Sequence, residues 1–390
     1  MAKKINVGMI GYSFMGKAHS FGYKNIGIFY EPEALPVMKV LCGRKAEGVS
    51  AAAERYGWDS YETDWKRMVH RDDIDLVDIC TPNNQHHEIV IGTAEAGKNI
   101  FCEKPLAKTL SEAKEMLEAV RKAGVKHMIG FNYRTVPAIV LAKRLIDEGK
   151  LGDIYHFRGV YLQDWIVDPS VPLSWRLDGE VAGSGPLGDL AAHTVDTARY
   201  LLGDITDVVA NCKTFIEERP LEAEVVKGTG IGDVQAAEET GKVTVEDAVM
   251  FLAKFANGAL GTFEATRFAT GRKNHNAFEV NGSKGSVRFC FEDMNRLEFY
   301  SREDEDYAQG WRNILATESI HEFAGAWWPP GHIIGYGETF VNEVYVLLDA
   351  LGKGEMPTPD FVDGVKCQAV LESVVNSVKS DAWESVETEF

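Results

Sequence analysis

Three polar residues near the middle of the chain have the types and the spacing of an acid–base site. Asp189, His193 and Asp196 follow the glycine-rich stretch 183–188, in a segment whose apolar residues recur at helical intervals. On a helix, spacings of four and three residues place these side chains along one face. A histidine beside a carboxylate is a competent general base near neutral pH. The segment therefore predicts a helix on which His193, with a carboxylate beside it, could act as a general base.

Two other interpretations of these residues stay open. Asp189 could cap the helix without taking part in chemistry, because aspartate is favoured at helix N-termini. The same spacing of Asp189, His193 and Asp196 could hold a metal ion. The sequence shows no further cluster of ligands, and we expect no metal.

A lysine stands in a second place where chemistry is expected. Glu103, Lys104 and Pro105 follow a short apolar run, 99–102, that reads as a buried strand. Oxidation of an alcohol by hydride transfer requires that the hydroxyl proton also leave, and a lysine can bind that oxygen. Pro105 restricts Lys104 to extended backbone conformations. We expect Lys104 to contact the reacting hydroxyl, and Glu103 and Lys104 are also candidate cofactor contacts; an exposed Lys-Pro turn is the alternative.

A glycine turn follows the first strand-like run and precedes a helical stretch. It reads Gly11-Tyr12-Ser13-Phe14-Met15-Gly16, the G-x-G-x-x-G pattern with serine in place of the second glycine. Such a turn delivers a helix N-terminus to a pyrophosphate, because its free N–H groups and dipole favour an anion. The turn predicts a bound dinucleotide. Its candidate cofactor-binding residues are Gly11, Ser13, Phe14, Met15 and Gly16.

The identity of the nicotinamide cofactor is open at this point. A carboxylate at the end of the second strand would bind the ribose diol of NAD. That strand instead ends Cys42-Gly43-Arg44-Lys45, a cationic end that tolerates the 2′-phosphate of NADP. Gly43 and Arg44 are therefore candidate cofactor contacts, with a solvated cation at a helix start as the alternative for Arg44.

A loop after the third long strand adds further candidates. In a doubly wound sheet, ligands lie at the carboxyl ends of the strands. Thr81, Pro82 and Asn83 stand at such an end and can contact ribose or carboxamide. His86 is either a site contact or a histidine that begins the next helix.

The elements that must position these residues divide the chain in two. Residues 1–130 alternate strand-like and helix-like segments, which predicts an α/β Rossmann domain with a doubly wound parallel sheet. Residues 131–390 contain many strand-like segments and two helical stretches, near 188–202 and 338–351. They predict an α+β domain with a large, mainly antiparallel sheet that binds substrate. We expect both helical stretches on one face of that sheet and homo-oligomers through the other. Residues 217–241 resemble a surface loop.

Composition excludes several classes of protein. The chain has 390 residues, 45% hydrophobic and 26% charged, and a formal net charge of −18. The charge disfavours nucleic-acid and anionic-membrane partners. Six scattered cysteines without a Cys-x-x-Cys pair indicate buried thiols in a reducing compartment. We find neither a signal-peptide core nor an apolar run long enough to span a membrane, and expect a cytoplasmic protein.

Taken together, these motifs resemble the glucose-fructose oxidoreductase / inositol dehydrogenase / rhizopine-catabolism (Gfo/Idh/MocA) family. The resemblance covers nearly the whole chain and rests on 11–16, 81–83, 103–105 and Gly188-Asp189…His193…Asp196 in that order. It implies an NAD(P)-dependent enzyme that moves a hydride between nicotinamide and a secondary hydroxyl of a sugar or polyol. It also implies that Lys104, Asp189 and His193 are catalytic and contact the substrate.

Several segments are most similar to the branch of the family that oxidises levoglucosan-like pyranoses at C3 with NAD. They are 30–36, 130–134, 161–165, 173–176 and 335–338. Aromatic faces suit the C–H faces of sugars, and polar tips suit the hydroxyls. The predicted pocket residues are Tyr133, Gln163 and Trp165 for the substrate and Asn132 and Arg176 for the cofactor; for each, packing in a core or loop is the alternative.

Two rival functions stay open. An enzyme of the same superfamily could hold NAD tightly, oxidise C3 transiently and cleave a glycoside. A regulator could keep the fold, bind the cofactor as a signal and lack catalysis. Product analysis separates the first rival from a dehydrogenase, and a turnover panel separates the second.

Overall fold

The computed structural model describes residues 3–222 and 236–390, which divide into two compact units. Unit 1 comprises residues 1–132 and 335–365 with Phe390, and unit 2 comprises 133–334 and 366–389. Within the described ranges, no helix has the length and apolarity needed to span a lipid bilayer.

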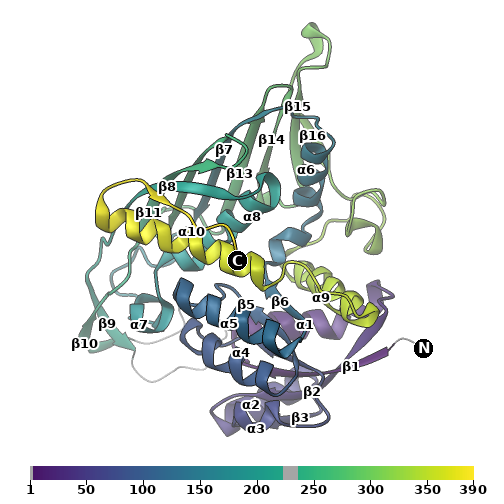
Figure 1. Cartoon of the computed structure of the whole chain (residues 1–390), viewed down its shortest axis with the longest axis vertical. Helices are drawn as coiled ribbons and strands as arrows, with labels where there is room; N and C mark the ends of the chain where they lie inside the picture. The colour runs from purple at the N-terminus through teal and green to yellow at the C-terminus, as the bar shows by residue number, and fades with distance from the viewer. Residues whose placement is uncertain (1–2, 223–235) are drawn as a thin grey trace. The chain divides into compact units, whose positions relative to one another are not determined.

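A six-stranded parallel sheet forms the centre of unit 1 (Figure 1). Its order is β3-β2-β1-β4-β5-β6, and every pair of neighbours is parallel. The central strands β1, β4 and β5 are mostly buried on both faces, which is why they read as largely apolar runs. This confirms the predicted doubly wound sheet. The strands are β1 (Lys3–Ile10), β2 (Ala34–Cys42), β3 (Ser60–Glu62), β4 (Leu76–Ile79), β5 (Asn99–Glu103) and β6 (His127–Gly130).

The helices of unit 1 connect these strands and cover the sheet. The strand order reverses at β1, so right-handed crossovers to β2 and to β5 place their helices on opposite faces. Thr109 caps α5, because its hydroxyl accepts the N–H of Glu112 at 3.2 Å. The helices are α1 (Phe14–Phe29), α2 (Ala46–Tyr56), α3 (Trp65–Val69), α4 (His86–Glu95), α5 (Leu110–Ala123) and α9 (Tyr336–Lys353).

The position of α9 corrects a sequence-based expectation. The stretch 338–351 was expected on the large antiparallel sheet, but α9 belongs to unit 1 and packs along α1 and against β2. Gly22 of α1 makes this possible, because a Cβ there would lie 2.8 Å from the carbonyl oxygen of Phe340. An amphipathic pattern shows that one face of a helix is buried and leaves its partner unspecified.

A nine-stranded sheet forms the centre of unit 2, in the order β16-β15-β14-β13-β7-β12-β11-β8-β17. Only β7 and β12 run parallel; all other neighbours are antiparallel, as predicted. The strands are β7 (Ile154–Leu162), β8 (Ile205–Lys213), β11 (Ala248–Phe255), β12 (Leu260–Thr266), β13 (His275–Gly282), β14 (Gly285–Cys290), β15 (Arg296–Ser301), β16 (Arg312–Leu315) and β17 (Glu384–Ser385).

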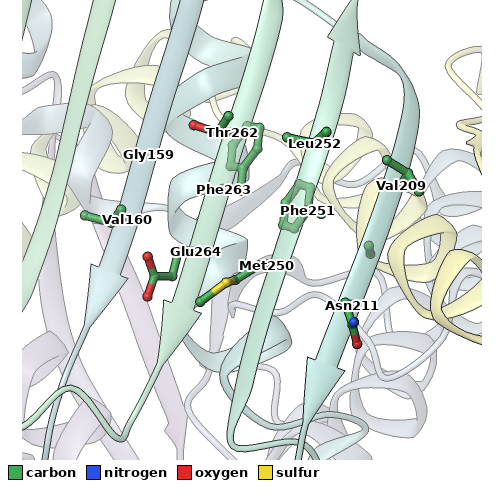
Figure 2. Close-up of a pocket in the computed structure, with 11 residues that line it drawn as sticks. Gly159, Val160, Val209, Asn211, Met250, Phe251, Leu252, Thr262, Phe263 and Glu264 are labelled. Carbon is green, nitrogen blue, oxygen red and sulfur yellow. The ribbon is translucent and has the colours of Figure 1, made fainter.

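The two faces of this sheet differ. Helix α8 (Ala192–Leu202) packs on β7, and α6 (Pro137–Asp147) packs on β14 and β15. The second part of α10 (Phe361–Ser380) reaches β8, where the Ser377 hydroxyl accepts the N–H of Ala210. The other face is open around β11 and β12. Figure 2 shows Met250, Leu252, Thr262 and Glu264 lining a shallow groove there.

A small second sheet in unit 2 falls in a segment expected to be a loop. Residues 217–241 were interpreted as a surface loop, but β9 (Glu218–Glu222) and β10 (Ala236–Lys242) pair antiparallel. The middle of this segment, 223–235, lies outside the described residues. Arg219 of β9 is fully buried and donates to the carbonyl oxygens of Ile166, Asp168 and Val171. The strand therefore fixes the loop 166–171. The polar composition of the segment 217–241 gives no sign of this contact.

Candidate active site

The glycine turn after β1 has the geometry of a dinucleotide cradle. Gly11 has a φ of 105°, and a Cβ there would lie 2.4 Å from the carbonyl oxygen of Cys80. A Cβ at Gly16 would lie 2.1 Å from the carbonyl oxygen of Gly11. Ser13 occupies the N-cap of α1 without a side-chain capping hydrogen bond. Backbone N–H groups of the first turn are thus left for a ligand, and the residues fit a pyrophosphate.

Tyr12 packs against the end of β2, which the sequence analysis did not foresee. A Cβ at Gly43 would lie 2.2 Å from its ring, and a Cβ at Gly48 would lie 2.7 Å from its hydroxyl. Arg44 is exposed at the same strand end. The geometry thus requires glycine at 43 for packing against Tyr12, whichever cofactor binds.

The loop after β4 is tied to the loop after β5 by His86. Its Nε2 lies 3.0 Å from the carbonyl oxygen of Thr81, and its Nδ1 lies 3.0 Å from that of Pro105. The ring is fully buried, and burial lowers the pKa of His86. Helix α4 begins at this residue. A contact between His86 and the cofactor stays a prediction. Asn83, also buried, begins a short 3₁₀ turn beside it.

Glu103 and Lys104 stand where β5 ends. Glu103 is 4% exposed, and its Oε2 accepts the backbone N–H of Lys104 at 3.1 Å. Its Oε1 lies 2.8 Å from Nε2 of His19, whose Nδ1 lies 2.9 Å from Asp78. The sequence analysis missed His19 and Asp78. The available signal was a carboxylate inside the apolar run Leu76–Ile79, since a buried charge requires a partner.

In unit 2, Asp189 lies in a wide π-helical turn, Leu187–Ala191, that precedes α8. Pro186 and Ala191, and not Asp189, occupy the N-cap positions of these two elements. Gly185 permits the sharp entry, because a Cβ there would lie 2.0 Å from the carbonyl oxygen of Glu246. π-helical turns recur at functional sites, where they redirect a side chain.

An arginine that the sequence analysis missed holds Asp189. Arg267 is fully buried, and its Nη2 donates to Asp189 Oδ2 at 2.8 Å. Its Nη1 donates to the carbonyl oxygen of Arg176 at 3.2 Å, and its guanidinium lies 5.6 Å from the ring centre of Trp165. Arg267 thus joins three predicted site residues. Burial lowers the pKa of Arg176, whose side chain stacks on its neighbour Trp175.

Asp196 pairs elsewhere. Arg134 donates to both of its carboxylate oxygens, at 2.9 and 2.6 Å. The bidentate pair is nearly buried, so it anchors α8 to the segment before α6. The extra residue of the π turn changes the helical phase between Asp189 and the rest of α8. This explains why Asp189 and Asp196, which their sequence spacing assigns to one helical face, lie beside different arginines.

His193 lies against a chain of hydrogen-bonded polar side chains. It is 8% exposed, with the rings of Tyr133 and Tyr161 centred 4.4 and 6.0 Å from its own. The Tyr161 hydroxyl donates to Asn274 Oδ1 at 2.8 Å, so the Tyr133 hydroxyl, 2.9 Å away, donates to Tyr161. Asn274 also accepts from Gln163 at 2.9 Å, since its Oδ1 has two lone pairs.

The chain continues to the predicted tryptophan. The Trp165 indole N–H donates to Gln163 Oε1 at 3.0 Å. Unit 2 therefore brings together His193 and the predicted pocket residues Tyr133, Gln163 and Trp165. Tyr161 and Asn274 were missed, because nothing in the sequence distinguishes them from ordinary strand and turn residues. Asn132 lies in unit 1, where its amide donates to Thr339 at 2.8 Å.

The predicted catalytic residues are divided between the units: Lys104 in unit 1, Asp189 and His193 in unit 2. The expected approach of Lys104 to His193 stays a prediction.

Comparison with known proteins gives matches along both units. Residues 5–131 match a family described as "Oxidoreductase family, NAD-binding Rossmann fold", and residues 139–288 match the "GFO/IDH/MocA C-terminal domain". Levoglucosan dehydrogenase from Pseudarthrobacter phenanthrenivorans is 43% identical over 387 residues, 98% of each chain.

Solved structures agree. A crystal structure of an oxidoreductase domain protein from Kribbella flavida has a TM-score of 0.93 at 48% identity, covering 99% of this chain and 100% of that one. A structure of levoglucosan dehydrogenase with NADH and levoglucosan has a TM-score of 0.92 at 42% identity, covering 98% and 100%.

Proposed function

This chain belongs to the Gfo/Idh/MocA family of oxidoreductases, and we propose that it transfers a hydride between NAD and a secondary hydroxyl of a pyranose sugar. The observation that carries the proposal is its similarity, over the full length of both chains, to levoglucosan dehydrogenase. A levoglucosan-like sugar, oxidised at C3, is the narrowest substrate that this similarity supports. Residues 1–130 hold the cofactor, and residues 131–390 hold the sugar.

The cofactor supplies the hydride acceptor, and the chain supplies its cradle. Gly11 and Gly16 allow close backbone approach, and the uncapped first turn of α1 offers N–H groups to the pyrophosphate. The family and the NADH complex of the similar enzyme support NAD. Arg44 is exposed beside Gly43 and is the residue through which a 2′-phosphate would be recognised. Kinetics with NAD and NADP decide between them.

Three residues of the chain carry the proton chemistry in this proposal. His193 takes the hydroxyl proton as the hydride leaves, Lys104 orients the same oxygen, and Asp189 supports the site. The Arg267 guanidinium forms an ion pair with Asp189 at 2.8 Å and holds its carboxylate in place. The tyrosines beside His193 limit its movement.

The hydrogen-bonded chain beside His193 suits a sugar. Trp165 offers an aromatic face for axial C–H groups, and Gln163 and Asn274 offer amide groups for hydroxyls. Tyr133 holds Tyr161 through its hydroxyl, which fixes the wall of the pocket.

Replacement of Lys104 tests the mechanism. Lys104→Ala should lower kcat with levoglucosan about 10²–10⁴-fold, because the reacting oxygen loses its positioning cation. NADH binding, followed by fluorescence, should persist. Lys122→Ala, at an exposed position of α5, is the matched control and should retain activity. Near-full activity of Lys104→Ala would contradict the proposed mechanism.

The same assay separates the rival functions. A panel of pyranoses, inositols and aryl glycosides is offered with NAD, and both NADH formation and aglycone release are measured. Net NADH formation supports the dehydrogenase. Aglycone release without NADH supports glycoside cleavage by transient oxidation, and cofactor binding without any turnover supports a regulator.

We further propose that a second copy of this chain covers the open face of the large sheet. Met250, Leu252 and Leu260 are about half exposed on the adjacent strands β11 and β12. Figure 2 shows Met250 and Leu252 on this face. Monomeric proteins seldom leave an apolar sheet face to solvent. Leu252→Glu should reduce the oligomer to monomer in light scattering, whereas Ile28→Glu, at an exposed site of unit 1, should not. A Leu252→Glu protein of unchanged mass would refute this interface.

A cytoplasmic location is also proposed. All six cysteines lie in the described ranges and are free thiols; Cys42 and Cys102 are buried in β2 and β5, and Cys80 is buried directly after β4. Thiols are maintained in a reducing compartment.

A further inference from the structure

A buried ionic cluster lies directly beneath the Lys104 loop in unit 1. His19 of α1 and Asp78 of β4 have no solvent exposure, and Glu103 at the end of β5 is 4% exposed. The imidazole lies between the carboxylates: Nδ1 is 2.9 Å from Asp78 Oδ2, and Nε2 is 2.8 Å from Glu103 Oε1. Three elements that are distant in sequence thus meet at one ring.

The geometry fixes the number of protons in the cluster. An ionised carboxylate only accepts hydrogen bonds, and a neutral imidazole has one N–H. Both ring nitrogens of His19 face carboxylate oxygens at hydrogen-bonding distance, so two protons are needed for the two contacts. An imidazolium between two carboxylates satisfies both. Removing one proton would leave two lone pairs facing each other in a dry site.

The surroundings favour the charged ring. Burial lowers the pKa of His19, but the electrostatic and hydrogen-bond interactions with Asp78 and Cys80 together outweigh it, and the pKa lies well above its ordinary value. The Cys80 thiol donates to Asp78 at 3.4 Å, and the Phe101 ring stacks on the imidazole at 4.8 Å. The other titratable groups nearby are Tyr23 on α1, Cys102 on β5 and, facing Tyr23, Glu343 on α9.

The cluster reaches Lys104 through Glu103. One carboxylate oxygen of Glu103 binds His19, and the other accepts the backbone N–H of Lys104 at 3.1 Å. Gly130 of β6 closes against this carboxylate: a Cβ there would lie 2.9 Å from Oε1. On the far side of Lys104, the carbonyl oxygen of Pro105 meets His86 at 3.0 Å. The backbone on either side of Lys104 is therefore held by a buried histidine.

We propose that His19 is a positioning residue for Lys104: its imidazolium bridges Asp78 and Glu103, and Glu103 in turn fixes the backbone from which the catalytic lysine projects. The inference rests on the proposed function, because it assigns His19 an effect that passes through Lys104. Without the ring, two carboxylates face each other in a buried site, and Glu103 must move or take up a proton. The backbone of Lys104 is then no longer held in one position. A displacement of a catalytic group by about 1 Å can lower a rate about 100-fold.

A double-mutant cycle between His19 and Lys104 tests this. His19→Asn should lower kcat about 10–100-fold, while the Kd for NADH changes less than about 3-fold. In the Lys104→Ala background, the same substitution should change the residual kcat less than about 2-fold, because the side chain that it positions is gone. His70→Asn, at an exposed histidine, is the control. Losses that multiply, or an NADH Kd that rises in step with the fall in kcat, would show a merely structural role.

A second measurement on the unaltered protein does not depend on a variant that folds. With ¹⁵N-labelled histidine in the full chain, the His19 ring should carry protons on both nitrogens at about pH 8, well above the ordinary histidine pKa. A His19 ring with only one protonated nitrogen would refute the proposed imidazolium bridge between Asp78 and Glu103.

The two proposals fail in different ways. A substrate panel in which the unaltered protein forms no NADH from NAD refutes the proposed function itself. An inactive Lys104→Ala beside a fully active His19→Asn refutes only the positioning role.

Discussion

His127, the first residue of β6, should make the protein sensitive to acid. It is buried, and its Nδ1 accepts the backbone N–H of Phe361 at 3.1 Å. The Phe361 ring lies 4.8 Å from the imidazole. Burial lowers the pKa of His127 from 6.5 to about 4, although the nearby charge of Asp360 opposes this. The neutral ring, with its proton on Nε2, is therefore the form that the fold requires.

The size of this loss of stability follows from the shift in the pKa of His127. The folded protein keeps His127 neutral down to about pH 4, whereas the unfolded chain takes up a proton near pH 6.5. Stability is therefore lost as pH falls through this window and is fully present above it. Each pKa unit corresponds to about 1.4 kcal/mol, so the free energy of unfolding should fall by about 3 kcal/mol from this residue.

His127→Asn isolates the contribution. Asparagine keeps an acceptor near the Nδ1 position and does not titrate in this range. The variant should be less stable at neutral pH by about 1–2 kcal/mol, because part of the ring volume is lost. Its stability should then fall by about 3 kcal/mol less than that of the unaltered protein between pH 7 and pH 4. Urea unfolding of the cofactor-free protein across this range measures both curves, and His70→Asn is the control.

The comparison removes the effect of other groups, because carboxylates that titrate in the same window contribute equally to both proteins. Parallel curves for His127→Asn and the unaltered protein would refute the reasoning from burial.

Two further predictions concern the site. Gly16→Ala should weaken NADH binding about 10–100-fold in fluorescence titration, because its Cβ would overlap the Gly11 carbonyl. Gly27→Ala is the control, because its Cβ would meet only Leu35, at 3.7 Å. It should bind NADH with unchanged affinity and have a slightly higher Tm. Equal NADH affinity of the two variants would contradict the proposed role of the glycine turn in cofactor binding. Arg267→Gln should lower kcat/KM for the sugar about 10–100-fold at saturating NAD, since Asp189 loses a charged hydrogen bond. An unchanged kcat/KM would show that the ion pair between Arg267 and Asp189 does not contribute to the reaction.

The sequence predicts what is local and periodic. The parallel sheet of unit 1 follows from short apolar runs, and the start of α5 follows from Thr109 and Glu112, whose side-chain and backbone groups meet within one turn. The glycine turn is equally local at Gly16, where a Cβ would lie 2.1 Å from the carbonyl oxygen of Gly11 in the same turn.

The contacts that the sequence could not predict join residues distant along the chain. Arg267 and Asp189 are 78 positions apart, and His19 and Glu103 are 84 apart. The partner of α9 and the pairing of β9 with β10 also depend on which surfaces meet after folding. The π turn at Asp189 is a local irregularity, but it depends on how Gly185 and Leu187 meet Glu246.

The return of the chain to unit 1 at residues 335–365 has a consequence for biosynthesis. A ribosome releases the β1–β6 region long before α9 and the Phe361 N–H exist, so α1 and His127 wait for partners made more than 200 residues later. The nascent nucleotide-binding unit must therefore stay incomplete until synthesis is nearly finished. A fragment that stops at residue 132 should be released with the apolar side of α1 uncovered, and it should aggregate or recruit chaperones where the full chain does not.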